Sequence, residues 1–314
     1  MNSSIRTVAA GGALAAVIAL AGCGAADAGG PSSAGGALSV VATTPEVADF
    51  VRNIGGSDVA VTQIIKPNVD PHEYEPTPAD IQAIGAAKLV VENGVGLEKW
   101  LAQTIESAGF KGTVVDASQG VPLRKGDPGN AEEAAGDPHI WHNPRNAKIM
   151  VADIDMGLAA AYPAHATTYQ KNLTDYSAKL DKLDADNLAA FAKLPADQRK
   201  LVTNHDAFGY YVDRYQLQFV GSVIPSMDTS AELSAKQLSD LVAKIKATGT
   251  KAIFTESSLP PKSAQAIAQQ AGVKVVGGED ALYGDSLGAQ GTAQGTYLGA
   301  EEHNTATIVQ ALGG

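Results

Sequence analysis

The 314-residue chain is poor in several kinds of residue, and each shortage excludes a class of structure or function. Its single cysteine, Cys23, allows no internal disulfide. Basic residues number 23 against 34 acidic ones, and a formal net charge of −11 excludes a typical nucleic-acid binder while suiting a protein that collects cations. The apolar run at residues 8–20 is shorter than the roughly 20 residues that a membrane-spanning helix needs.

The N-terminus has the features of a targeting segment. Arg6 precedes the apolar run, which ends in Leu20-Ala21-Gly22-Cys23 and resembles the bacterial lipobox. We expect a lipoprotein signal peptide at residues 1–22, cleaved before Cys23, whose thiol then carries lipid. An ordinary secretory signal followed by a chance cysteine is the alternative. Residues 23–37 are mostly glycine, alanine, serine and proline, so they predict a flexible tether between membrane and domain.

From Leu38 onward, short apolar runs alternate with helical stretches, which predicts βα units with parallel sheets. One stretch differs, since residues 169–194 form a long amphipathic pattern without glycine or proline. The prediction is an α/β fold of two βα lobes (residues 38–166 and 195–314), joined by one linking helix (residues 167–194). The expected strands are 38–42, 59–65, 89–91, 113–115, 201–203, 219–224, 252–254 and 273–276. The other expected helices are 45–54, 78–87, 97–108, 147–161, 207–215, 234–246, 263–271 and 296–312.

Four residues with metal-binding side chains stand in loops of this pattern. His72 and His139 both lie in an Asp-Pro-His sequence, where proline stiffens the loop that presents the imidazole. His205 follows the strand that opens the second lobe, and Asp285 follows the last strand. Ligands of open parallel sheets bind beyond the carboxyl ends of the strands. Two facing lobes would therefore bring the four side chains together in the cleft between them.

Several motifs in order resemble the metal-binding solute-binding lipoproteins of bacterial ABC importers for zinc and manganese (cluster A-I, zinc-binding type). The resemblance runs from about Leu38 to the C-terminus. It implies a metal held by His72, His139, His205 and Asp285, and lobes joined by a single rigid helix. The motifs are Asp70-Pro71-His72-Glu73-Tyr74-Glu75-Pro76-Thr77-Pro78, Asp137-Pro138-His139-Ile140-Trp141, Asn204-His205-Asp206-Ala207-Phe208, Glu256-Ser257-Ser258 and Leu282-Tyr283-Gly284-Asp285-Ser286-Leu287-Gly288.

Three imidazoles and one carboxylate suit tetrahedral Zn²⁺. Manganese, the second choice, gains more from carboxylates, and in the resembling family the third ligand is often glutamate in manganese binders, where this chain has His205. Copper would outrank zinc on affinity alone. A closed four-ligand site also argues against an enzyme, because catalytic zinc usually keeps an open position. Carboxylates that could accept the imidazole N–H groups are Glu73, Glu75, Asp137, Asp206 and Glu256.

The chain is therefore predicted to be an extracytoplasmic zinc receptor, anchored through Cys23, monomeric, and delivering its ion to an ABC importer permease. A zinc hydrolase would need a motif such as His-Glu-x-x-His, which the chain lacks. A surface adhesin with a structural metal is a further alternative.

Other residues near the motifs have less specific interpretations. After Trp141 the resembling family commonly has an apolar residue followed by Asp-Pro, whereas this chain has His142-Asn143-Pro144. We expect His142 to be a polar loop residue rather than an extra ligand. His165 and His303 are expected on the surface. Trp141 could lie close to the metal or simply pack. Residues 124–136 are expected to form a surface loop, and because they contain no histidine, no metal-loading role is expected of them.

Overall fold

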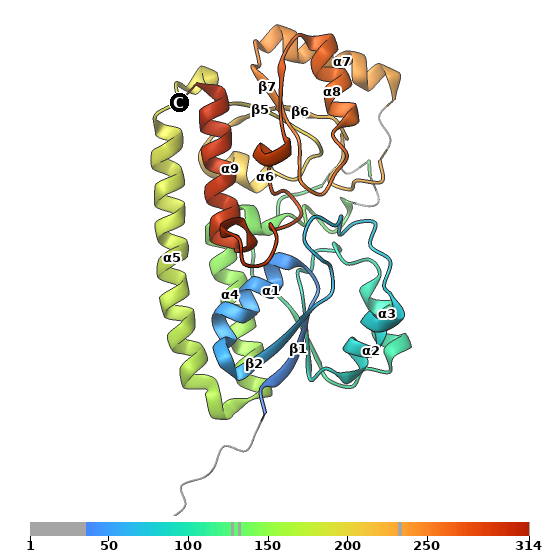
Figure 1. Cartoon of the computed structure of the whole chain (residues 1–314), viewed down its shortest axis with the longest axis vertical. Coiled ribbons are helices and arrows are strands. Elements are labelled where there is room, and N and C mark those ends of the chain that lie inside the picture. The colour runs from blue at the N-terminus through green and yellow to red at the C-terminus, as the bar shows by residue number, and fades with distance from the viewer. Residues whose placement is uncertain (1–35, 127–128, 131–132, 232–233, 314) are drawn as a thin grey trace, which may run out of the picture. The chain divides into compact units, whose positions relative to one another are not determined.

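The computed structural model describes residues 36–126, 129–130, 133–231 and 234–313 (Figure 1). The predicted signal peptide, Cys23 and the tether up to residue 35 lie outside these ranges. The chain from Gly36 onward forms one compact unit. Within the described residues, no helix combines the length and the apolarity needed to cross a membrane.

The first half of this unit is built on a parallel sheet in the order β2-β1-β3-β4. Val40 of the central strand β1 lies opposite Val61 on one side and Leu89 on the other. The apolar runs of the two central strands are buried, as is typical of parallel strands covered by helices on both faces. The strands are β1 (Leu38–Ala42), β2 (Val59–Gln63), β3 (Leu89–Glu92) and β4 (Thr113–Asp116), and the helices are α1 (Pro45–Gly55), α2 (Pro78–Ala86), α3 (Leu101–Ala108) and α4 (Pro144–Ala161).

The second half repeats the βα alternation with two parallel strand pairs. Strands β5 (Lys200–Thr203) and β6 (Gln218–Ser222) form one pair, and β7 (Ala252–Phe254) and β8 (Lys274–Val276) form the other. Strands β5 and β7 lie next to each other. The helices are α6 (Gly209–Tyr215), α7 (Ala235–Thr248) and α8 (Lys262–Ala271). The predicted α/β fold with parallel sheets is confirmed.

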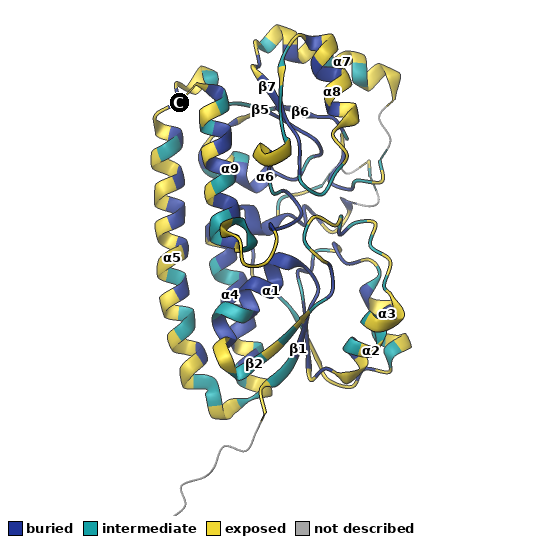
Figure 2. Ribbon diagram, in the orientation of Figure 1, coloured by how far each residue is buried: buried dark blue, intermediate teal, exposed yellow. Residues whose placement is uncertain are grey.

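Two long helices contribute to the hydrophobic cores of both halves. Helix α5 (Ala166–Ala192) buries Tyr176 in the first core and Phe191 in the second. Helix α9 (Tyr297–Leu312) packs along α5 and likewise buries its first residue in the first core and Ile308 in the second (Figure 1). Figure 2 shows α1 buried along most of its length, whereas α5 keeps an exposed side. The limits of the two predicted lobes stay a prediction.

One predicted helix begins four residues late. The pattern predicts a helix from Leu97, but α3 starts at Leu101. Gly94, Val95 and Gly96, immediately before the predicted start, all have positive φ, so the chain turns here rather than leading straight into a helix. The chain instead turns around Glu98, whose buried carboxylate accepts hydrogen bonds from the backbone N–H groups of Asn93 and Gly94.

Candidate metal centre

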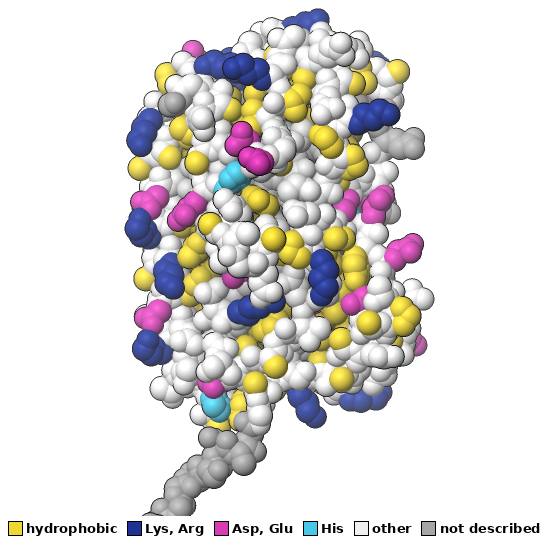
Figure 3. All heavy atoms as spheres, viewed as in Figure 1, with side chains coloured by type: hydrophobic (Ala, Val, Ile, Leu, Met, Phe, Trp, Pro, Cys, Tyr) yellow, Lys and Arg dark blue, Asp and Glu magenta, His cyan; other side chains and the backbone are white. Residues whose placement is uncertain are grey.

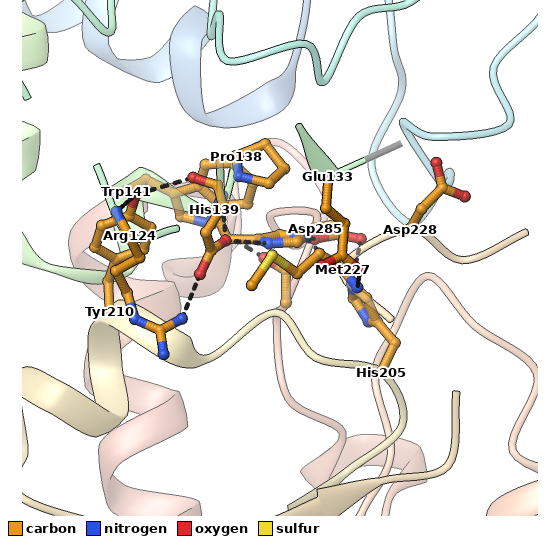
Figure 4. Close-up of polar contacts among 12 residues, drawn as sticks. Arg124, Glu133, Pro138, His139, Trp141, His205, Tyr210, Met227, Asp228 and Asp285 are labelled. Carbon is orange, nitrogen blue, oxygen red and sulfur yellow. Dashed lines mark hydrogen bonds and ion pairs between the residues drawn. The ribbon is translucent and has the colours of Figure 1, made fainter. Parts of the chain in front are cut away.

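The structure brings His72, His139, His205 and Asp285 together, with one donor atom from each within 4.8 Å of all the others. His72 comes from the loop after β2, and His139 directly precedes a short 3₁₀ helix, Ile140–His142. His205 follows β5, and Asp285 follows β8. Figure 4 shows His139, His205 and Asp285 converging. Loops from both halves of the fold therefore supply the cluster, as the strand pattern predicts.

The distances between donor atoms fit a small four-coordinate ion. The Nε2 atoms of His72 and His205 each lie 3.3 Å from Nε2 of His139. Oxygens of Asp285 lie 3.1–3.4 Å from the three Nε2 atoms. A tetrahedron with metal–ligand bonds of about 2.05 Å has edges of about 3.3 Å. Both oxygens of Asp285 are buried and lie next to the three Nε2 atoms, as expected for a carboxylate that shares a cation with them.

The aspartates of the two Asp-Pro-His loops make the same local hydrogen bond but differ in their other partners. Oδ1 of Asp70 accepts the backbone N–H of His72, and Oδ1 of Asp137 accepts that of His139. Only Asp137 also accepts from the imidazole, with Nδ1 of His139 at 2.8 Å. This hydrogen bond leaves Nε2 of His139 as the atom that faces the cluster. Asp70 instead uses Oδ2 to accept a hydrogen bond from the hydroxyl of Thr229, in the second half of the chain, with 2.6 Å between the two oxygens.

Glu256 orients His205 in the same way. One oxygen of its buried carboxylate accepts both the backbone N–H and the ring Nδ1–H of His205, each at 3.0 Å. A Cβ added to Gly284 would lie 2.0 Å from the other oxygen, so the residue before Asp285 must lack a side chain. The Gly284 carbonyl also accepts from the indole N–H of Trp141 at 3.2 Å. Trp141 therefore lies against the site, and its ring centroid is 5.5 Å from that of His139.

The charges of the metal-free site stabilise protonated imidazoles. Burial alone would lower the pKa of His139, but the Asp285 charge and the hydrogen bond to Asp137 raise that pKa to about 9. Burial likewise opposes protonation of His205, and the charges of Asp285 and Glu256 raise its pKa well above the usual value. For Asp285, burial would raise the pKa, and the two imidazoles hold it well below the usual range. A cation entering the site must therefore displace protons.

Only two of the carboxylates proposed to support the ligands do so. Asp137 and Glu256 accept imidazole N–H groups as described above. Glu73 and Glu75 are exposed, and no hydrogen bond joins either side chain to a described site residue. Asp206 is half-buried and lines a cavity next to β6 and α7, and no hydrogen bond joins its side chain to an imidazole within the described residues. Closeness in sequence to a cluster residue misled the prediction for these three, because neighbouring loop residues point in different directions.

The other histidines lie outside the cluster, but none is simply exposed. His142 is fully buried, its Nδ1 lies 2.7 Å from Oε1 of Glu301, and its ring stacks on that of Phe208 with centroids 4.4 Å apart. It is thus neither a ligand nor a polar loop residue. His165 is half-buried beside Asp58, and His303 is half-buried with Nε2 3.0 Å from a backbone carbonyl.

Residues 124–136 are more than the expected surface loop. Arg124 donates to Oδ2 of Asp137 at 2.6 Å, and the buried carboxylate of Glu133 accepts from Ser226 in the second half of the chain at 2.9 Å. No local signal in the sequence marks either contact. Arg124 and Asp137 are common loop residues, and Glu133 and Ser226 are distant in sequence. Figure 4 shows Arg124 and Glu133 around the site.

A small cavity of about 10 Å³ reaches the cluster at His72, with room for about one water molecule. At its rim, Lys99 donates to Asp228 across the two halves at 2.7 Å. The cavity is lined by His72, Val95, Gly96, Lys99, Glu133, Gly136, Pro138, Met227 and Asp228. Elsewhere, the face drawn in Figure 3 carries acidic and basic side chains interspersed rather than gathered by sign.

Comparison with known proteins gives consistent matches over nearly the whole chain. The family model ZnuA, described as zinc-uptake complex component A, periplasmic, matches residues 40–311. The manganese-binding lipoprotein MntA of Bacillus subtilis is 34% identical over 303 residues, covering 95% of this chain and 97% of its own. The zinc-binding protein TroA of Treponema pallidum is 36% identical over 285 residues, covering 90% and 91%. The solved structure of periplasmic zinc-binding TroA superposes with a TM-score of 0.80 at 33% identity, covering 88% of this chain and 99% of that one.

Proposed function

The chain belongs to the ZnuA family, and from that membership we propose that it is the zinc receptor of an ABC importer, binding Zn²⁺ outside the cytoplasm and delivering it to the permease. The observation that carries the proposal is the buried cluster of His72, His139, His205 and Asp285. Its donor atoms are spaced for a tetrahedral ion, and two of its imidazoles are held by carboxylates. The receptor would be anchored through lipid on Cys23 and act as a monomer.

Zinc is proposed over manganese because the donor set is rich in nitrogen. Three imidazoles and one carboxylate match the ligands that Zn²⁺ prefers, whereas Mn²⁺ is harder and gains more from oxygen donors. The relatives do not decide the metal, since MntA is named for manganese and TroA for zinc. Manganese is therefore the second candidate for the same site.

Transport rather than catalysis is proposed because all four positions around the ion would be filled by protein atoms. A zinc hydrolase would need a position open to water and a carboxylate placed as a general base. Asp137 and Glu256 are both engaged with imidazoles. A structural metal in an adhesin is the third interpretation, and it predicts that removal of the ion unfolds the chain.

The decisive experiment is titration of the metal-free chain from residue 36, which forms one compact unit, with Zn²⁺ followed by competition with excess Mn²⁺. One tight equivalent of zinc that manganese cannot displace is the expected result. Displacement by manganese would keep the receptor and change its cargo. Absence of tight binding to either ion would contradict the receptor function, and unfolding on chelation would favour the adhesin.

A further inference from the structure

The guanidinium of Arg124 joins the first half of the chain to the helix that follows His205. Its Nη1 donates to Oδ2 of Asp137 at 2.6 Å, and its Nε donates to Oδ2 of Asp213 in α6 at 2.8 Å. Asp137 is fully buried, Arg124 is 31% exposed, and Asp213 is 64% exposed. The arginine therefore connects a buried carboxylate at the metal centre to one at the surface.

The two oxygens of Asp137 are divided between two partners. Oδ1 accepts the backbone N–H and the ring Nδ1–H of His139, while Oδ2 accepts only from Arg124 among the described residues. A charged hydrogen bond to Arg is stronger than a neutral one and fixes the plane of the carboxylate. The orientation of His139 thus depends on a carboxylate that Arg124 in turn holds.

The start of α6 is shaped around this pair. The hydroxyl of Tyr210 accepts the backbone N–H of Arg124 at 3.0 Å and donates to the backbone carbonyl of Asp137 at 2.9 Å. The guanidinium carbon lies 5.7 Å from the centre of the Tyr210 ring. A Cβ added to Gly209 would lie 1.6 Å from Nη1 of Arg124, so only glycine leaves room for the guanidinium there. Gly209 stands four residues after His205.

Building on the proposed zinc-receptor function, we propose that Arg124 is a positioning residue of the metal centre: through Asp137 it fixes His139, and through Asp213 and Tyr210 it ties this ligand to the helix that follows His205. Two ligands from different halves of the chain are thereby held in one geometry. Arg124 is absent from the lining of the cavity that reaches His72, so it should slow the loss of the ion rather than its entry.

The sign of the expected effect separates positioning from plain electrostatics. Arg124→Gln removes a positive charge close to the site, which by Coulomb's law alone would strengthen the binding of a cation. Positioning predicts the opposite, since loss of a group that supports a ligand typically weakens metal binding about 10- to 100-fold. Because Arg124 acts through Asp137, we expect the lower end of that range, about 10-fold, expressed as faster dissociation.

The test compares zinc dissociation rates after mixing the loaded protein with excess chelator, together with association rates and the melting temperature of the metal-free form. Arg124→Gln should release zinc about 10-fold faster, with an unchanged association rate and a similar melting temperature. Arg124→Lys should restore part of the loss, because lysine keeps the charge but not the fork that reaches two carboxylates. Arg145→Gln is the matched control, since Arg145 and Arg124 both line a second cavity, away from His72, but Arg145 pairs with Asp184 instead.

Asp213→Asn keeps the test decisive if Arg124→Gln does not fold. Asp213 is exposed, so this variant should fold, and it should speed dissociation by about two- to threefold, the scale of a surface ion pair. Unchanged dissociation in both Arg124→Gln and Asp213→Asn, or an equal change in Arg145→Gln, would overturn the inference. Failure of the wild type to bind zinc would instead overturn the proposed function.

Discussion

At the scale of single residues, the proposed zinc site requires each of its three imidazoles. His139→Ala should reduce zinc affinity by more than the roughly 10- to 100-fold typical of supporting groups, because a ligand itself is lost. The fold should persist, since the site is assembled from loops. Chelator competition measures the affinity, and the melting temperature of the metal-free form reports the fold. His165→Ala, which removes a histidine outside the cluster, is the control. Unchanged affinity in His139→Ala would exclude that residue from the site.

The raised pKa values of the imidazoles predict that zinc displaces protons. The pKa of His139 is raised to about 9, and the charges of Asp285 and Glu256 also raise the pKa of His205, so the metal-free site favours protonated imidazole, opposite to what burial alone would give. Binding at pH 7 should therefore release one to two protons, and affinity should rise as pH increases toward 9. Calorimetry in buffers of different ionisation enthalpy counts the protons. A binding enthalpy independent of buffer would contradict the prediction.

Glu46, at the start of α1, should make the metal-free protein less stable as pH rises. Burial raises its pKa to about 8, and one of its oxygens has no hydrogen-bond partner within the described residues. The unfolded chain ionises this group near its ordinary pKa of 4.5 while the folded chain keeps it protonated, so stability falls between about pH 4.5 and 8.

Glu46→Gln removes this titration. The unfolding free energy of Glu46→Gln should rise relative to that of the wild type across this pH interval, by several kcal/mol in total. This magnitude follows because each unit of pKa shift corresponds to about 1.4 kcal/mol. Urea unfolding at a series of pH values provides the measurement. Glu106→Gln, at an exposed position, should show no such growth. A constant difference between Glu46→Gln and wild type would contradict the assignment.

Sequence reasoning found the four clustered residues because their motifs follow strands whose carboxyl ends meet. It could not find Arg124, because an arginine in a polar loop carries no local sign that its partner, Asp213, lies 89 positions away. It also overvalued Glu73 and Asp206, since neighbours of a ligand in sequence need not face the same way. Contacts between residues distant in sequence are decided by tertiary packing, which periodicity does not encode.

At the scale of elements, apolar periodicity located the helices and strands closely, because each element has a buried side with the matching repeat. The linking helix was predicted at residues 167–194, from an amphipathic pattern over 169–194, and α5 runs from Ala166 to Ala192. The late start of α3 was missed because it depends on backbone angles at Gly94, Val95 and Gly96 and on a buried carboxylate. The hydrogen bonds that the Glu98 carboxylate accepts from the backbone leave the apolar pattern unchanged, so periodicity cannot reveal them.

The close packing of α4 on β4 predicts a specific steric cost. A Cβ added to Gly157 would lie 2.4 Å from Cγ2 of Val115. Gly157→Ala should therefore destabilise the chain by about 1–3 kcal/mol, although alanine favours a helix. Denaturant unfolding measures the change. Val115→Ala added to Gly157→Ala should recover part of the loss. Stabilisation by Gly157→Ala alone would show that the helix moves away freely.

At the scale of the whole molecule, two helices span both hydrophobic cores. Helix α5 packs on α1, α4 and α9, and α9 reaches from the second core to the first. A wide hinge motion would have to disrupt both interfaces. We therefore expect metal binding to change the radius of gyration of residues 36–314 very little. Solution scattering with and without zinc is the measurement, and a large metal-dependent compaction would contradict it.

The position of Tyr297 has a consequence for how the chain becomes functional. This residue, near the end of the sequence, packs in the first core with its ring centroid 4.9 Å from that of Phe50, and its backbone N–H donates to Asp49, 248 positions earlier. The first half thus remains incomplete until residue 297 has been synthesised. A chain exported before it folds would therefore leave the cytoplasm without an assembled site for the ion. Loading would then follow folding, so the ion bound reflects the metals outside the cytoplasm rather than those where the chain is made.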